Sequence, residues 1–184
     1  PRLAITQIKS RLNVNAAAVQ IPIGLENEFK GVVDLVEQKA NYFDGQFGEK
    51  IVVAEIPENL KEAATKARKE LLEAVAEVDP ELEELYLNAE DPMKDISVED
   101  LKKAIRRAVV GRTFAPVFMG SAIKNKGVQK CLDGVVDYLP NPLEKKEKAF
   151  VHKDLLSQQE IQYGSKRVIE KPEEFWLEND ANKP

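Results

Sequence analysis

The feature that most constrains the fold is an apolar run, followed by a short polar loop and then an amphipathic stretch. Residues 114–119 read Phe-Ala-Pro-Val-Phe-Met, and residues 120–127 read Gly-Ser-Ala-Ile-Lys-Asn-Lys-Gly. Apolar residues then recur at helical spacing over 128–139. An apolar run without alternation is typical of a strand covered on both faces of a parallel sheet. The sequence therefore predicts an α/β fold with the loop at the carboxyl end of a strand, where such sheets bind ligands.

The first 56 residues predict a helix and a small antiparallel unit. We expect the helix to end near Asn13, and strands at 17–23, 29–36 and 50–56. Gly31 indicates a possible bulge in the second strand. The stretch 41–48 is expected to be a hairpin connection, because Asp44-Gly45 favours a turn with positive φ.

The next segment is helical. Apolar residues repeat at intervals of three and four over 60–78, which predicts a helix of about five turns. Asp79-Pro80 predicts a stop and a restart, since aspartate caps helices and proline is favoured at the first helical position. Ser97 opens a further helix in a capping-box pattern, and Gly111 is placed to cap its carboxyl end.

Residues 143–184 lack sustained periodicity, and we expect an irregular tail in which Phe175-Trp176 docks on the body. Cys131 is the single cysteine and His152 the single histidine, which excludes an internal disulfide and argues against a zinc site built from several histidines. The chain begins without Met and without a signal-peptide pattern, so we expect a fragment or a processed product.

Composition indicates a globular protein with an uneven charge distribution. Of 184 residues, 43% are hydrophobic and 32% charged, with a net charge of −5. Residues 55–100 hold 15 acidic and 5 basic side chains, whereas residues 101–130 hold 8 basic and no acidic ones. The acidic block argues against direct nucleic-acid contact there, because phosphates would be repelled. This separation of acidic and basic segments can indicate two opposed binding faces, or it can mean only that the charged helices face solvent.

The loop at 120–127 does not match the phosphate-binding pattern Gly-x-x-x-x-Gly-Lys-Ser/Thr, and neither does any other stretch of the chain. No pair of carboxylates is placed for acid–base catalysis, so we expect no catalytic residues. A base-recognition loop fits better, because Gly120, Ser121 and Ala122 let the backbone approach a planar ring closely. An ordinary turn remains the alternative.

The surrounding sequence resembles the elongation factor G family of translational GTPases. The resemblance lies in the stretches 114–129 and 132–142 and, upstream, in 19–24 and 29–35. Asn15-Ala-Ala and the stretch 42–48 look most like the mitochondrial type. The resemblance covers about three quarters of the chain, and the separated motifs occur in the family's order.

The resemblance implies the carboxyl-terminal portion of a P-loop-GTPase-like G domain, with the family's small α/β G′ subdomain inserted. Residues 1–24 and 113–142 would belong to the G domain, 25–112 to the G′ insertion, and 143–184 to a divergent tail. The family's guanine-contacting loop maps onto Ser121, Ala122, Ile123 and Lys124. GTP or GDP with Mg²⁺ would be the ligand of the parent protein, bound weakly or not at all by this chain, which lacks the P-loop, switch regions and Asn-Lys-x-Asp motif.

The resemblance further implies a ribosomal partner, including its stalk protein, with no membrane and no sequence-specific nucleic-acid binding. We expect the stalk surface on Lys102, Lys103, Arg106 and Arg107. The implied role is translocation in mitochondrial protein synthesis, in the matrix, with a cytoplasmic location as the alternative. A stand-alone module that binds the stalk without GTP chemistry, and the paralogous ribosome-recycling GTPase, are the other hypotheses.

Overall fold

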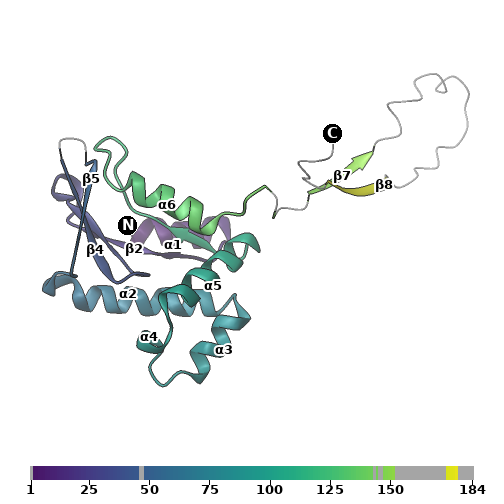
Figure 1. Cartoon of the computed structure of the whole chain (residues 1–184), viewed down its shortest axis with the longest axis horizontal. Coiled ribbons are helices and arrows are strands. Elements are labelled where there is room, and N and C mark those ends of the chain that lie inside the picture. The colour runs from purple at the N-terminus through teal and green to yellow at the C-terminus, as the bar shows by residue number, and fades with distance from the viewer. Residues whose placement is uncertain (1, 46–47, 143, 145–146, 152–172, 178–184) are drawn as a thin grey trace, which may run out of the picture. The chain divides into compact units, whose positions relative to one another are not determined.

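The computed structural model describes residues 2–45, 48–142, 144, 147–151 and 173–177 (Figure 1). The chain divides into two compact units between Leu139 and Pro140. The first unit mixes α-helices with a parallel and an antiparallel sheet, which confirms the predicted α/β class.

An antiparallel four-stranded sheet occupies the first half of the chain. Its strands are β2 (Gln20–Ile23), β3 (Gly31–Asp34), β4 (Lys39–Asp44) and β5 (Lys50–Ala54), in that spatial order. A short 3₁₀ turn, η1 (Glu26–Glu28), connects β2 to β3. The predicted domain boundary at residue 24 lies after β2, which is hydrogen-bonded to β3 in this sheet.

Two expectations for this sheet are wrong in detail. Gly31 forms no bulge, because it pairs in regular register with Ile23 and with Tyr42. A Cβ at Gly31 would lie 2.2 Å from the Asn41 carbonyl oxygen, so glycine serves the close approach of the strands. The stretch 41–48 is only partly a connection, since β4 continues to Asp44 and the turn begins at Gly45, with φ of 93°.

The predicted strand at 17–23 is two strands in two different sheets. β1 (Ala16–Ala18) pairs in parallel with β6 (Ala115–Val117), and the chain then turns at Val19 into β2. β6 was expected to be buried on both faces, but its three residues are only half-buried. The reason is that β1 is its one partner in the described chain, so this parallel sheet has two strands.

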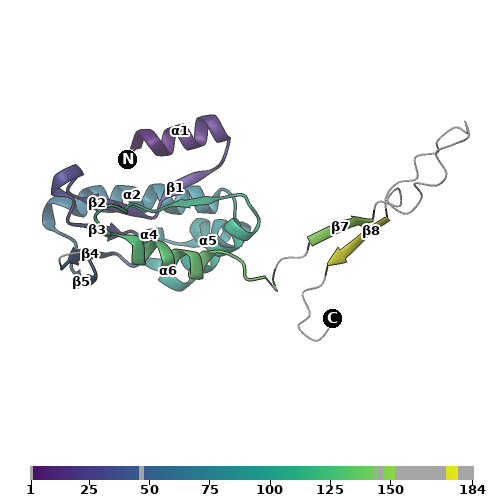
Figure 2. The ribbon, with the colours of Figure 1, turned by 90° about the horizontal axis from the view of Figure 1, so that it is seen from above.

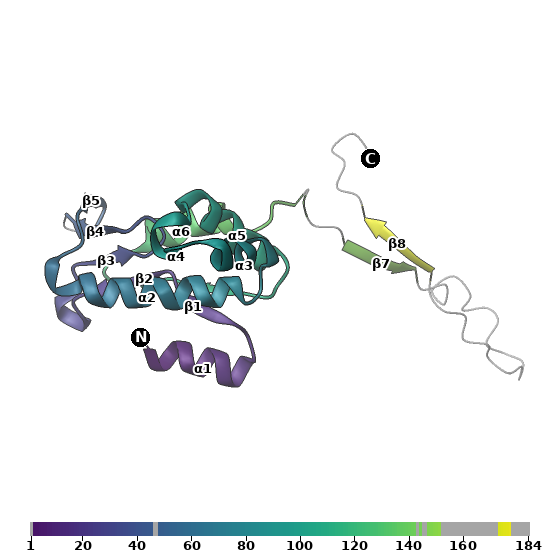
Figure 3. The ribbon, with the colours of Figure 1, turned by 90° about the horizontal axis from the view of Figure 1, so that it is seen from below.

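Four helices follow the antiparallel sheet: α2 (Glu58–Ala76), α3 (Pro80–Asn88), α4 (Pro92–Asp95) and α5 (Val98–Val110). Figure 3 shows α2 running past β1, which it contacts. The main core joins Val33 and Leu35 of β3 and the turn after it to Leu71 of α2 and Ile105 of α5. The predicted helices at 60–78 and after Ser97 are therefore confirmed.

The three predicted caps are confirmed in position. The Asp79 carboxylate accepts a hydrogen bond from Leu82 N, and Ser97 Oγ accepts one from Asp100 N. Gly111 is the C-cap of α5, and its N–H donates to Arg107 O, but its φ of −69° is not the left-handed conformation typical of a capping glycine. Arg112, with φ of 59°, takes that conformation instead.

The two remaining helices of this unit are α1 (Arg2–Leu12) and α6 (Val128–Tyr138), which Figure 2 shows on opposite sides of the body. Both were predicted, but the apolar stripe of α6 does not face the core. Val136 is 77% exposed and Leu132 59%, whereas Gly134 and Tyr138 are buried. Periodicity identifies an apolar face, but the described chain provides no surface to cover this one.

The second unit contains two strands, β7 (Glu147–Val151) and β8 (Glu173–Leu177), which pair antiparallel with Glu147 opposite Leu177. The expectation of an irregular tail is wrong for these residues. The expected docking of the Phe175 and Trp176 side chains, and the role of His152, lie outside the described part of the structure.

Candidate functional site

The loop between β6 and α6 is a closed, tight turn. Ser121 N donates to Lys126 O at 2.8 Å, and Lys126 N donates to Ser121 O at 3.0 Å. Asn125 N donates to Ala122 O at 3.0 Å, so the tip consists of residues 122–125. Ile123 at this tip is 100% exposed. The four predicted site residues therefore lie together on a projecting turn.

Two glycines close the base of this turn. A Cβ on Gly120 would lie 2.8 Å from Lys126 O, and a Cβ on Gly127 would lie 2.8 Å from Met119 O. Gly127 also has φ of 84°, a conformation that side-chain-bearing residues rarely adopt. Because Gly127 is at the same time the N-cap of α6, the loop and the helix begin from one fixed point.

Lysine side chains tie the loop to the segment after β2. Lys124 Nζ lies 3.2 Å from Glu26 O and 3.4 Å from Asn27 Oδ1. Lys126 Nζ lies 3.0 Å from Phe29 O. These ammonium groups satisfy main-chain carbonyls, so their first role in the structure is to hold the loop in place.

The backbone at the tip remains open to a ligand. Within the described residues, the N–H groups of Ala122 and Ile123 donate to no acceptor. An apolar cavity of about 390 Å³ adjoins the loop, with walls that include Ile5, Phe29 and Met119. Ser121 lines this cavity, whereas the other three predicted residues do not. The two N–H groups at the tip therefore belong to residues outside the cavity wall, and Ser121 connects the tip to the cavity.

The basic residues of α5 are largely engaged within the fold. Lys102 Nζ lies 3.2 Å from Glu37 Oε1 and 3.3 Å from Asp137 Oδ2. Arg106 Nη1 donates to the Asp137 carbonyl oxygen at 2.9 Å, near the carboxyl end of α6. Cations are favoured there because the helix dipole is negative at that end. Lys103, by contrast, is exposed.

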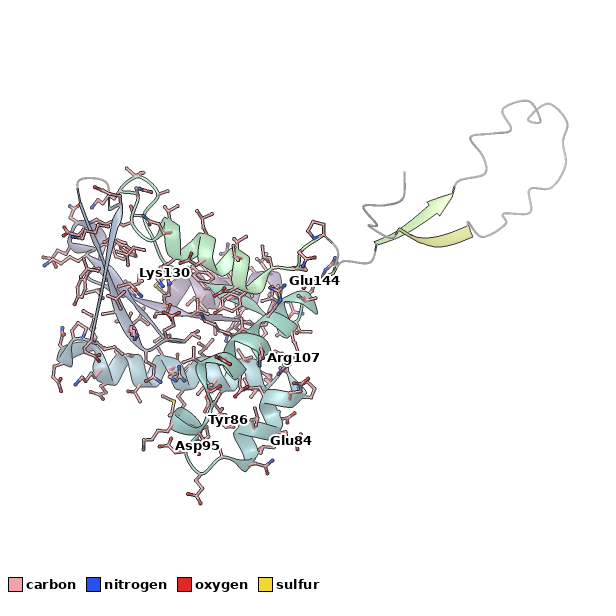
Figure 4. The ribbon with its side chains drawn as sticks, viewed as in Figure 1. Glu84, Tyr86, Asp95, Arg107, Lys130 and Glu144 are labelled. Atoms are coloured by element: carbon pink, nitrogen blue, oxygen red, sulfur yellow. The ribbon has the colours of Figure 1, made fainter. Side chains whose placement is uncertain are left out.

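Arg107, labelled in Figure 4, holds two acidic residues at the start of α3. Its Nε and Nη2 contact the two carboxylate oxygens of Asp79 at 2.9 and 2.6 Å, and Nη1 lies 3.0 Å from Glu81 Oε2. The hydrogen bonds from Arg107 lower the pKa of Asp79. Sequence reasoning missed these pairs, since Arg107 and Asp79 are 28 positions apart.

Charged groups also gather where β3, α5 and α6 meet, around a cavity of about 280 Å³. Burial opposes ionisation of Glu37, but the hydrogen bond from Lys102 and the charge of Lys130 outweigh it and lower the pKa of Glu37. Burial raises the pKa of Tyr138. Lys130, labelled in Figure 4, lies 3.8 Å from Glu37 Oε2. These contacts join the antiparallel sheet to the two helices.

The described residues offer neither a metal centre nor a membrane span. No group of three or more His, Cys, Asp or Glu side chains among them is arranged to hold a metal ion. None of the helices in this part of the chain is long and apolar enough to cross a membrane.

Comparison with known proteins finds a relative that agrees with the resemblance noted in the sequence. The chain is 44% identical over 161 residues to the mitochondrial elongation factor G of Drosophila mojavensis, and the match covers 88% of this chain. Over these residues the chain is similar to elongation factor G. It spans 21% of that relative's length. No family model matches the chain.

The likeness to elongation factor G has a structural counterpart. A crystal structure of a protein from Thermus thermophilus superposes on the chain with a TM-score of 0.65 and 27% sequence identity. The superposition covers 82% of this chain and 22% of the Thermus protein. The shared fold supports the α/β architecture as a partial G domain with its G′ subdomain.

Proposed function

We propose that this chain is the part of a ribosome-dependent translational GTPase that supplies one wall of the guanine pocket and a ribosome-facing subdomain. The parent protein would use GTP to promote translocation in mitochondrial protein synthesis. The name of the Drosophila relative supports the mitochondrial matrix as the location.

The observation that carries this proposal is the preformed turn at residues 121–126. Its tip has two unengaged N–H groups, on Ala122 and Ile123, that point to recognition of a ring oxygen by the main chain. Ser121 borders the adjoining apolar cavity, which gives the ring an apolar surface. Lys124 holds the turn through Glu26 and Asn27, so its contribution would be to position the backbone donors.

The exposed stripe on α6 supports a role within a larger body. Leu132, Val135, Val136 and Leu139 are each between 46% and 77% exposed. Contiguous apolar surface of this kind usually marks a face that another element covers. In the full GTPase we expect the remainder of the G domain to cover it.

Calorimetric titration with GDP tests the assignment. The 184-residue chain has no phosphate-binding loop in its sequence. We therefore expect the chain alone to bind GDP weakly or not at all, and the full GTPase to bind it tightly. Replacing Ala122 by proline in the full GTPase removes one of the two N–H donors and should weaken binding. Submicromolar affinity for the isolated chain would refute the view that the loop is only one wall of the pocket.

The proposed stalk-binding surface is on α5, at Lys102, Lys103, Arg106 and Arg107. Since Lys102, Arg106 and Arg107 also bind groups within the fold, Lys103 is the informative position. Lys103→Glu should weaken binding of a stalk-protein peptide without loss of helicity. Unchanged affinity for this variant would count against the surface.

A further inference from the structure

Arg68 on α2 is a buried cation that pairs with no carboxylate in the described part of the chain. Its side chain is 2% exposed, and Nη1 donates to the main-chain oxygens of Leu35 and Val36, the latter at 3.0 Å. The Nε atom is buried and has no hydrogen-bond partner among the residues that the structure describes. Within the described residues, no ion pair joins the guanidinium to an acidic side chain. A buried charge in this state is costly unless a further partner satisfies it.

Arg68 lines a cavity of about 270 Å³ between α2 and the turn after β3. Lys61 and Thr65 precede it on the same face of α2, at helical spacing of four and three residues. The opposite wall includes Asp34 and Gln38. A water molecule takes up about 30 Å³ in the liquid, so the cavity has room for a small polar ligand and some of its hydration.

The cavity also presents hydrogen-bond acceptors. Asp34 Oδ1 accepts from Val36 N at 2.9 Å and from Glu37 N at 3.0 Å, while Oδ2 takes no bond from the described residues. Thr65 Oγ1 donates its proton to Lys61 O at 2.9 Å, which leaves its lone pairs free to accept. The ligand that satisfies Arg68 should therefore carry both negative oxygens and a proton to donate.

We propose that this cavity binds a protonated oxyanion of the hydrogen phosphate class, either free phosphate or a phosphate monoester. Its negative oxygens would accept from the Arg68 guanidinium and from the Lys61 ammonium. Lys61 Nζ lies 2.6 Å from Glu58 Oε2 in the structure, and the ligand would replace this exposed partner. Its P–OH group would donate to Asp34 or Thr65. Sulfate has the same shape but no proton at neutral pH, so the Asp34 carboxylate would repel it. Glu55, also on the cavity wall, disfavours a fully deprotonated anion for the same reason.

Thermal unfolding of the 184-residue chain at pH 6, where both free phosphate and much of a phosphate monoester still carry a P–OH proton, tests this proposal. Sodium phosphate, methyl phosphate, sodium sulfate and sodium chloride are compared at one ionic strength. We expect phosphate to raise Tm by several degrees over chloride, and sulfate by less than half as much. An equal rise with methyl phosphate would assign the site to phosphate monoesters as well, whereas no rise with it would restrict the site to the free anion.

Three variants locate the site. Lys61→Gln should reduce the phosphate effect at least threefold, whereas Lys69→Gln, on the same helix but outside the cavity and 62% exposed, should leave it unchanged. In Asp34→Asn, phosphate and sulfate should raise Tm by equal amounts. Because the two anions are compared within one variant, the result does not depend on how stable that variant is. No rise in Tm beyond chloride, or an unchanged phosphate effect in Lys61→Gln, would overturn the proposal.

Discussion

Arg107 binds the Asp79 carboxylate with two parallel hydrogen bonds, of 2.9 and 2.6 Å, from the last turn of α5 to the N-cap of α3. Asp79 is 5% exposed, and its Oδ2 also accepts from Leu82 N. One carboxylate therefore caps a helix and joins it to a second one. Since the charge is buried, its partner is needed for stability.

Removing this partner should destabilise the chain. We expect Arg107→Ala to lower the free energy of unfolding by about 2 kcal/mol, because it leaves a buried carboxylate with one hydrogen bond and Arg107 itself is partly exposed. Urea denaturation followed by circular dichroism measures the change. Lys103→Ala on the same helix is the control, with an expected effect below about 0.5 kcal/mol. Equal effects of the two substitutions would show that the pair contributes nothing.

The same pair predicts a dependence of stability on pH. Its hydrogen bonds lower the pKa of Asp79 in the folded chain below the ordinary value of 3.8. The unfolded chain therefore takes up this proton first as pH falls. The stability that ionised Asp79 contributes is fully present above its pKa in the unfolded chain, and it is lost as pH falls through its lower pKa in the folded chain. In urea denaturation between pH 5 and pH 2, the free energy of unfolding should fall less steeply with decreasing pH for Asp79→Asn than for the wild type. Identical pH dependence in the two proteins would contradict a lowered pKa of Asp79.

The N-cap of α5 provides a second stability test. Ser97 Oγ accepts from Asp100 N at 3.1 Å and donates to Asp100 Oδ2 at 2.6 Å. Ser97→Ala should cost about 1 kcal/mol, because an N–H of the first turn loses its acceptor. Ser10→Ala on α1, where the serine is exposed and caps nothing, is the matched control. A cost for Ser97→Ala no greater than that of the control would show that the cap is dispensable.

Gly127 should not tolerate a side chain. Its φ of 84° and the contact of 2.8 Å that a Cβ would make with Met119 O both oppose alanine. Gly127→Ala should lower the free energy of unfolding by more than about 1 kcal/mol. Gly111→Ala, at a φ of −69° with the nearest atom at 3.2 Å, should cost less. Thermal unfolding of both variants decides the matter, and a smaller loss at Gly127 would contradict the described turn.

The two faces of α6 should respond differently to substitution. Val136→Gln should change the free energy of unfolding by less than about 0.5 kcal/mol, because the side chain is 77% exposed. Tyr138→Ala should cost about 3 kcal/mol, because Tyr138 is buried against Phe118. A large loss of stability in Val136→Gln would mean that the stripe is covered in solution.

Local signals predicted local structure well. Asp79 and Ser97 cap their helices as expected, because capping depends on residues only three positions apart. The position of the loop before α6 followed from the apolar run and the helical spacing around it. Gly120 and Gly127 were included in that loop, but their role in closing it depends on contacts across its base.

Long-range contacts were not predictable from one sequence. Lys124 binds Glu26 O, 98 positions earlier, and the basic residues of α5 bind acids and carbonyls from α3, α6 and the turn after β3. A count of charges cannot reveal such pairs. The outward stripe of α6 is a different case, since its helical period was predicted correctly but a period does not say whether the face is covered. Whether an apolar face is covered depends on the rest of the molecule.

The hydrogen bonds that close the turn between Ser121 and Lys126 affect the entropy cost of ligand binding to the loop. Because the hydrogen bonds across the turn form as the chain folds, the loss of conformational freedom occurs before any encounter. A ligand then meets donors already in position, and the affinity reflects contacts rather than loop ordering. A substitution that loosens the turn, such as Gly127→Ala, should therefore slow the binding of a ligand as well as lower the stability of the fold. The loop would then have to find its conformation during binding.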